Sequence, residues 1–270
     1  MLTVSIGPLS LSLAQLLLLS AFVIALIVGA ITGRKEGVPI AGTLSDIFLA
    51  ALVAARIGFV VQYLEHYKDN LWGVIDIRDG GFSVISGLAG AMALIAWKLW
   101  RQPKIRRSLT IASASGLLVW GSVSLLVALM ESSSRGLPQT TFTLLDGSPV
   151  ALAEVADDKP MVVNLWASWC PPCIREMPVL EKAQQDNPDI TFVYVNQGEH
   201  PETIIRFMSQ NKLSLQNVLT DTSASLGRTT GSQALPTTLF YDAKGQQVNA
   251  HLGELSRASL AHNLRSFNTD

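Results

Sequence analysis

The chain has 270 residues, of which 49% are hydrophobic and only 15% charged, and its formal net charge is −1. This length predicts about two domains, and charges this balanced argue against a nucleic-acid partner. The apolar residues concentrate before about Ser132, whereas the sequence after Gly136 has the mixed composition of a water-soluble domain. We therefore expect a membrane domain followed by a soluble one.

Four segments of the first half are long and apolar enough to cross a hydrocarbon core. We predict an all-α bundle of four membrane helices at roughly residues 11–30, 43–63, 82–100 and 109–130. The start, MLTVSIGPLS, contains no Lys or Arg, so the first segment is predicted to be a retained helix and not a cleaved signal peptide. Small residues four apart, such as Ser83 and Gly87, are typical of contacts between membrane helices.

Lys and Arg residues in the loops predict the orientation of these helices. The first and third loops are the basic ones, with Arg34, Lys35, Arg101, Lys104, Arg106 and Arg107. Positive charges favour the cytoplasmic side, so both termini are predicted to be periplasmic. We therefore expect a multi-pass protein of the bacterial inner membrane whose second half lies where disulfide bonds persist.

One charged residue, Arg56, lies well within the second predicted helix. A charge inside the membrane is a functional candidate by default. A long cationic side chain near a helix end can also extend to the water interface and act as an anchor. Both interpretations of Arg56 stay open at the level of sequence.

The stretches AARIGFVV and DIRDGGFSVISGLAGA, which lie within residues 54–91, resemble the early part of prolipoprotein diacylglyceryl transferase. That family consists of integral membrane enzymes that add a lipid to lipoprotein cysteines, and the resemblance covers about residues 10–100. The family commonly has a functional histidine where this sequence has Ile85, and its later Gly-Arg-x-Gly-Asn-Phe signature has no counterpart. The resemblance therefore implies a membrane anchor that contacts lipid, without transferase activity.

Residues 132–137 predict a short polar linker, so the expected domains are residues 1–131 and 138–270. TFTLLDGSPVAL predicts a hairpin that turns at Asp146 and Gly147. MVVNLWA and ITFVYVN predict buried strands, PETIIRFMSQN predicts a helix opened by proline, and two later strands flank a turn at residues 242–245. With a closing amphipathic helix, the predicted order is β–α–β–α–β–β–α behind the hairpin, an α/β domain.

The only cysteines, Cys170 and Cys173, lie in SWCPPC, at the junction of a predicted strand and helix. Pro171 and Pro172 fit only the first turn of that helix, where no intrahelical hydrogen bond is lost. Free N–H groups and the helix dipole would stabilise a Cys170 thiolate, and one turn brings Cys173 back beneath it. We predict thiol–disulfide exchange, with Cys170 as nucleophile, Cys173 as resolving thiol and no cofactor beyond this redox-active disulfide. No metal site is predicted, because a zinc site needs about four ligands.

The stretches NLWASWCPPCIREMPVLE and ALPTTLFYDAKG resemble the two signatures of membrane-anchored TlpA/ResA-type thiol–disulfide oxidoreductases, over about residues 137–268. The resemblance implies a thioredoxin-like fold and a cis peptide bond before Pro236, which would place the Leu235 backbone beside the sulfurs to pair with a substrate strand. It also implies that Glu176 accepts or returns the proton of the resolving thiol. A solvated first-turn carboxylate is the alternative for Glu176.

The expected contacts with substrate are Trp169, Pro171, Pro172, Leu235 and Pro236. The expected function is a membrane-anchored periplasmic oxidoreductase that reduces disulfides of exported partner proteins, a direction implied by the resemblance. Since the four helices contain no cysteine, a separate membrane protein of thiol-carrier type would have to supply the electrons. The alternatives are a disulfide oxidase or isomerase on the same fold, and a module that binds or delivers Cu(I) through the two thiolates.

Overall fold

The computed structural model describes residues 3–6, 9–68, 70–131, 136–232 and 234–268. Contacts divide the chain into two compact units. One comprises Leu13–Ile77 and Gly81–Ser132, and the other comprises Ser133–Asp270 with Met1–Ser12 and Arg78–Gly80. Most of the predicted linker, residues 132–135, lies outside the described residues.

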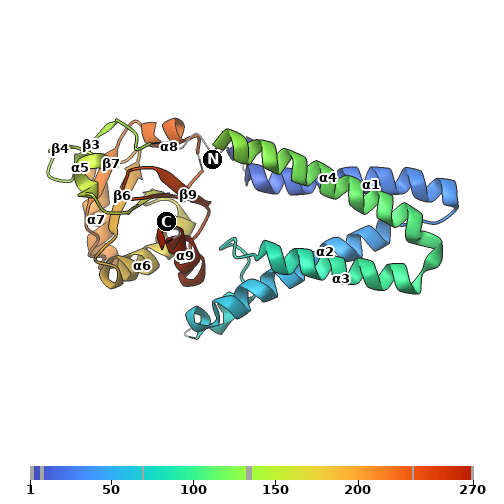
Figure 1. Cartoon of the computed structure of the whole chain (residues 1–270). Coiled ribbons are helices and arrows are strands. Elements are labelled where there is room, and N and C mark those ends of the chain that lie inside the picture. The colour runs from blue at the N-terminus through green and yellow to red at the C-terminus, as the bar shows by residue number, and fades with distance from the viewer. Residues whose placement is uncertain (1–2, 7–8, 69, 132–135, 233, 269–270) are drawn as a thin grey trace. The chain divides into compact units, whose positions relative to one another are not determined.

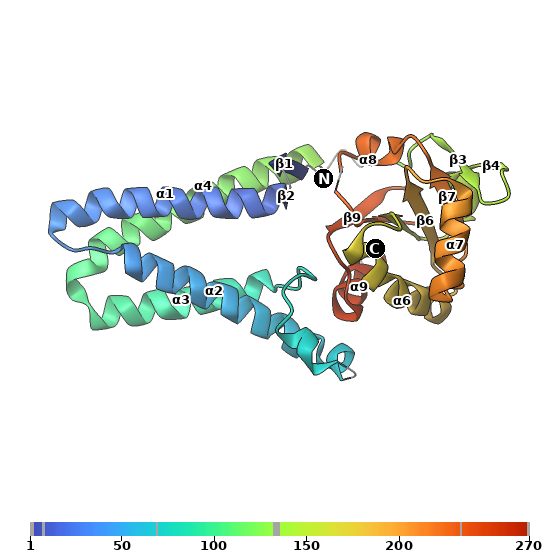
Figure 2. The ribbon, with the colours of Figure 1, turned by 180° about the vertical axis from the view of Figure 1, so that it is seen from behind.

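The helical unit is built from four long helices, α1 (Leu13–Glu36), α2 (Ala41–Gln62), α3 (Val84–Arg101) and α4 (Arg106–Glu131). Within the described residues, four helices are long and apolar enough to cross a membrane. α1 packs along α4, and α2 packs along α3 (Figure 1). The predicted bundle of four long apolar helices is therefore confirmed. Ahead of α1, β1 (Thr3–Ile6) and β2 (Leu9–Ser12) form an antiparallel hairpin that was not predicted (Figure 2).

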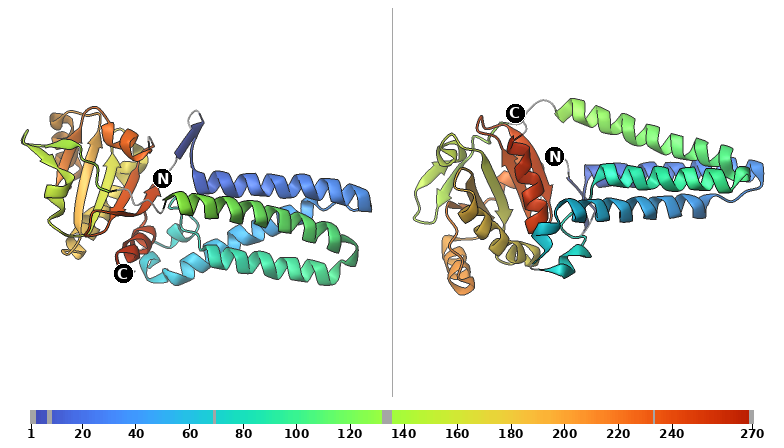
Figure 3. Two further views of the ribbon diagram at one scale, coloured as in Figure 1. Left: turned by 45° about the horizontal axis from the view of Figure 1, so that its top comes forward. Right: turned by 60° about the horizontal axis from the view of Figure 1, so that its bottom comes forward.

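Small residues allow α2 and α3 to approach closely, as predicted for Gly87. A Cβ atom added at Gly87 would lie 3.1 Å from Cβ of Ala55 and 3.2 Å from the Ala51 carbonyl oxygen. The helices connect at one end through η3 (Pro103–Ile105) and the α1–α2 turn. The α2–α3 connection, with η1 (Leu64–Tyr67) and η2 (Leu71–Val74), lies at the other end (Figure 3).

Arg56 of α2 is buried, and its guanidinium group holds the α2–α3 connection by hydrogen bonds to backbone carbonyl oxygens. Nε donates to Val74 at 3.0 Å, Nη1 to Gly81 at 2.9 Å, and Nη2 to Gly73 at 2.7 Å and Asp76 at 2.6 Å. Buried charges are tolerated where hydrogen bonds replace their hydration. The geometry of these bonds therefore favours a structural role for Arg56 over the functional one.

The second unit contains a seven-stranded mixed sheet in the order β4-β3-β7-β6-β5-β8-β9. The strands are β3 (Thr141–Leu144), β4 (Pro149–Ala151), β5 (Met161–Trp166), β6 (Thr191–Gln197), β7 (Val218–Asp221), β8 (Thr237–Tyr241) and β9 (Gln247–Leu252). β5, β6 and β7 are parallel to one another, and the outer strands pair antiparallel. All six residues of β5 are buried, as expected for the apolar run MVVNLW at the centre of a sheet.

Helices cover both faces of this sheet. α6 (Pro171–Asp186), α7 (Pro201–Asn211) and α9 (Arg257–Leu264) share one apolar cluster, whereas α5 (Leu152–Ala156) and α8 (Ser225–Thr230) belong to the other. Figure 1 shows α6 and α9 on the side of the sheet opposite to α8. A short turn, η4 (Arg265–Asn268), follows α9. This is the predicted thioredoxin-like fold with an added N-terminal hairpin; α5, β7 and α8 were not predicted.

Candidate active site

The two cysteines lie where β5 passes into α6. Cys170 is the N-cap residue of α6 in an extended conformation, and its sulfur accepts a hydrogen bond from the Cys173 backbone N–H at 3.3 Å. Pro171 and Pro172 occupy the first helical turn, as predicted. The sulfur of Cys170 therefore sits at the end of the helix that carries unpaired N–H groups and favours negative charge.

Cys170 and Cys173 are joined by a disulfide bond, with their Cα atoms 5.3 Å apart. Cys173 is fully enclosed at 0% exposure, whereas Cys170 retains 3%. Both cysteines are therefore buried in the disulfide-bonded form. Cys170 is thus the less enclosed of the two, which is the order expected if an incoming thiolate were to attack Cys170.

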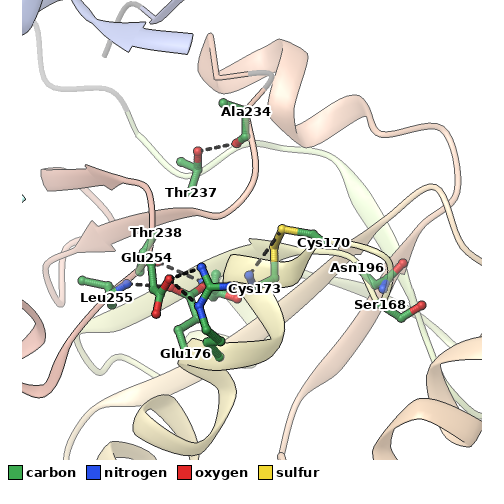
Figure 4. The surroundings of a disulfide bond; sticks show 12 residues. Ser168, Cys170, Cys173, Glu176, Asn196, Ala234, Thr237, Thr238, Glu254 and Leu255 are labelled. Atoms are coloured by element: carbon green, nitrogen blue, oxygen red, sulfur yellow. Dashed lines mark hydrogen bonds and ion pairs between the residues drawn. A yellow bond between two sulfur atoms is a disulfide. The ribbon is translucent and has the colours of Figure 1, made fainter. Parts of the chain in front are cut away.

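Glu176, one turn after Cys173 on α6, is fully buried (Figure 4). Its Oε1 accepts from Nδ2 of Asn164 at 2.8 Å, and its Oε2 accepts from the backbone N–H of Leu255 at 2.8 Å. Burial raises the pKa of Glu176 to about 8, although both hydrogen bonds oppose the shift. This burial excludes the solvated-carboxylate interpretation. A carboxyl group that titrates near neutrality, one helical turn from a thiol, can exchange protons with it.

The predicted cis bond is present between Leu235 and Pro236. The turn that carries it is fixed by Thr237, whose hydroxyl donates to the Ala234 carbonyl oxygen at 2.7 Å (Figure 4). The Pro236 carbonyl oxygen in turn accepts from the Gly253 backbone N–H at 3.0 Å. Pro236 is buried and Leu235 is partly buried.

The two tryptophans of WASWC differ sharply in exposure. Trp166 is fully buried and packs on Phe207 of α7, with ring centroids 5.2 Å apart. Trp169 is 67% exposed although it directly precedes Cys170, and Pro171 is exposed on the other side of Cys170. Exposing the apolar ring of a tryptophan to water is unfavourable in free energy. Exposed aromatic side chains of this kind are enriched in protein interfaces.

Ser168, Asn196 and Glu199 form a polar cluster near the cysteine pair that was not predicted from the sequence. The Glu199 carboxylate accepts from the Ser168 backbone N–H at 2.7 Å, from the Ser168 hydroxyl, and from Nδ2 of Asn196 at 2.7 Å. Ser168 lies two residues before Cys170, and Figure 4 shows Ser168 and Asn196 close to the disulfide. Glu199 thereby fixes the backbone that presents Trp169 and Cys170. Its position after β6, three residues beyond a buried Asn, carried no recognisable signal.

Comparisons with known proteins find one match in each half of the chain. Residues 132–264 match the family model described as Redoxin, and residues 1–124 match the family model for prolipoprotein diacylglyceryl transferase. Both predicted resemblances are therefore confirmed.

Among curated proteins, the thiol–disulfide oxidoreductase ResA of Halalkalibacterium halodurans is 32% identical over 114 residues, which are 42% of this chain and 64% of that protein. The thiol:disulfide interchange protein DsbE of Pasteurella multocida is 26% identical over 145 residues, 48% of this chain and 79% of that protein. A secreted Mycobacterium tuberculosis disulfide oxidoreductase of solved structure is 27% identical, covers 47% of this chain and 96% of its own, and has a TM-score of 0.43. The predicted enzyme class agrees with the names of the two curated relatives.

Proposed function

We propose that the protein is a membrane-anchored thiol–disulfide oxidoreductase that reduces disulfides of exported proteins in the periplasm. The observation that carries the proposal is a Cys-Pro-Pro-Cys pair whose outer sulfur caps a helix while its inner sulfur lies one turn from a buried acid. The names of the ResA and DsbE relatives support the same chemistry.

In the proposed reaction the reduced pair begins with a Cys170 thiolate. It attacks one sulfur of the partner disulfide, forms a mixed disulfide and releases the first partner thiolate. The Cys173 thiol then loses its proton and attacks the Cys170 sulfur. The Cys170–Cys173 disulfide forms, the second partner thiolate leaves, and two electrons have passed to the partner.

Glu176 is the proposed acceptor of the Cys173 proton. Cys173 is enclosed, so bulk water does not reach its thiol directly. A carboxylate is the stronger base when its pKa is raised, and the pKa of Glu176, about 8, approaches the usual value of a thiol. The proton can then pass from Cys173 to Glu176 without a large free-energy gap.

Substrate contacts are proposed at the exposed Trp169 and Pro171, with Pro172 beside them. The cis turn at Leu235 and Pro236 would offer its backbone to an extended substrate segment. Since the four long helices contain no cysteine, a membrane protein of thiol-carrier type would return the Cys170–Cys173 disulfide to its reduced form.

Residues 1–131 would serve as the anchor, in contact with membrane lipid, and residues 138–270 as the catalytic domain. The basic loops before Ile40 and after Trp100 support a cytoplasmic position for these loops and a periplasmic position for both termini. The catalytic domain would then lie outside the reducing cytoplasm.

The proposal is tested by trapping partners on full-length protein in cells. Cys173→Ser should accumulate mixed disulfides with exported proteins, because the resolving thiol is missing, whereas Cys170→Ser is the matched control and should accumulate none. Equal trapping by the two variants, or none by either, contradicts the proposal. A reduction potential of about −270 mV supports a reductase, and one of about −120 mV supports the oxidase alternative.

A further inference from the structure

A buried polar side chain, Asn164, interrupts the apolar strand β5. It is 1% exposed and lies on the same face of the sheet as Val162 and Trp166, beneath α6. Its Nδ2 donates to Oε1 of Glu176 at 2.8 Å and to Oγ1 of Thr238 at 3.0 Å.

The orientation of the amide suits only one protonation state of Glu176. Both carboxyl oxygens accept hydrogen bonds, one from Asn164 and one from the Leu255 backbone N–H. A neutral carboxylic acid must instead donate one bond, and neither of these N–H groups can accept it. The Oδ1 atom of Asn164 is a buried acceptor that has no hydrogen-bond partner among the described residues.

A half-turn of the amide about its Cβ–Cγ bond exchanges Oδ1 and Nδ2 with almost no change in shape. After this turn Oδ1 faces Glu176 and Thr238, and both the acid and the hydroxyl can donate to it. An ionised aspartate at position 164 would lack the donor, and leucine would lack both the donor and the acceptor.

We propose that the Asn164 amide reorients with the protonation state of Glu176, donating through Nδ2 to the carboxylate and accepting through Oδ1 from the neutral acid. Asn164 is then a positioning residue that keeps both states hydrogen-bonded, so Glu176 can take up a proton and release it within one turnover. Its value for catalysis rests on the proposed function, but the reorientation itself would occur in an inactive protein as well.

Other charged and titratable groups face Glu176 from the elements around it. Glu254, which precedes Leu255, is paired with Arg175 of α6, with Nε 2.9 Å from Oε2, and its charge raises the pKa of Glu176. Tyr194 of β6 lies near enough for the charge of Glu176 to raise its pKa, and Cys173 lies one turn before Glu176 on α6. Of these groups, Glu254 acts on the pKa of Glu176. The Tyr194 hydroxyl, like Asn164 Oδ1, is a buried polar atom without a hydrogen-bond partner among the described residues.

The test uses oxidised full-length protein in detergent, with ¹³C in glutamate carboxyl groups and ¹⁵N in asparagine amides. The Glu176 signal is identified by its loss in Glu176→Gln and followed against pH. The matched pair is Asn164→Leu and Asn196→Leu, since Asn196 is equally buried but donates to Glu199 at 2.7 Å. Asn164→Ser replaces the leucine variant in this comparison if that variant does not fold.

We expect Asn164→Leu to raise the pKa of Glu176 by about one unit, because the charge-assisted bond to the carboxylate is the stronger of the two bonds lost. Asn196→Leu should leave that pKa within about 0.3 unit. In the unsubstituted protein, the Asn164 side-chain amide signal should shift with the same midpoint as Glu176.

An Asn164 amide signal that stays constant across the Glu176 titration overturns the proposal. Equal displacement of the Glu176 pKa by both leucine variants also overturns it. These measurements need no catalytic turnover. A protein that traps no partner would contradict the proposed function, and the Asn164 proposal would still be tested independently.

Discussion

Replacing Glu176 by Gln should change how the stability of the second unit depends on pH. The ordinary pKa of this carboxyl group is 4.5, and burial raises it to about 8 in the folded protein. Between these two pH values the folded state holds one proton more than the unfolded state. The free energy of unfolding therefore falls as pH rises.

The size of this effect follows from the displacement of the pKa. Each pH unit in the window lowers the free energy of unfolding by about 1.4 kcal/mol, so about 5 kcal/mol is lost between pH 4.5 and 8. The stabilisation is fully present below pH 4.5 and gone above pH 8. Glu176→Gln cannot titrate, so this part of the pH dependence disappears.

The assay is urea unfolding of full-length protein at pH 5 and at pH 8. Unfolding is monitored through the hydrogen exchange of the buried β5 amides. The variant should lose about 4 kcal/mol less than the unsubstituted protein between these pH values, because the window spans three pH units at about 1.4 kcal/mol each. Glu202→Gln, on the exposed first turn of α7, is the control and should keep the original slope. Equal pH dependence in Glu176→Gln and the original protein would refute the reasoning.

Three further substitutions separate the roles of other residues. Trp169→Ala should change the free energy of unfolding by no more than about 0.5 kcal/mol and weaken binding of a disulfide partner at least tenfold, by about 2 kcal/mol, as seen in steady-state kinetics. Glu199→Ala leaves the Ser168 N–H and hydroxyl without their acceptor and should cost about 1–3 kcal/mol in urea unfolding. Arg56→Leu removes the donor to four backbone carbonyls, so limited proteolysis within residues 64–81 should become faster; unchanged cleavage would contradict its structural role.

Much of the architecture could be predicted because its signals are local. Long apolar runs predict the four helices, and PETIIRFMSQN predicts α7 with the bounds Pro201–Asn211. The proline-opened helix after Cys170 was predicted for the same reason. β7 and α8 were missed because they are only four and six residues long, too short for a periodic pattern. α8 also follows Ala224 in a left-handed conformation, which the sequence does not announce.

In the candidate site, too, contacts between residues near in sequence could be predicted, whereas contacts between distant residues could not. Cys170, Cys173 and Glu176 follow one another at three-residue intervals over the first two turns of α6, so their proximity follows from spacing alone. The partners of Glu176 come from β5 and from Leu255, 79 residues away, and tertiary packing alone brings them together. Asn164 is nevertheless visible in the sequence as a polar residue within the apolar run MVVNLW. A polar amide inside a buried strand requires a hydrogen-bond partner.

The most direct test of the central claim is the alkylation rate of each cysteine in reduced full-length protein as a function of pH. We expect Cys170 to react as a thiolate with a midpoint well below about 8.5, the value for free cysteine, and the enclosed Cys173 to react far more slowly. If Cys170 titrates at or above that value, or reacts no faster than Cys173, the claim that the Cys170 sulfur is activated by its position at the start of α6 is contradicted.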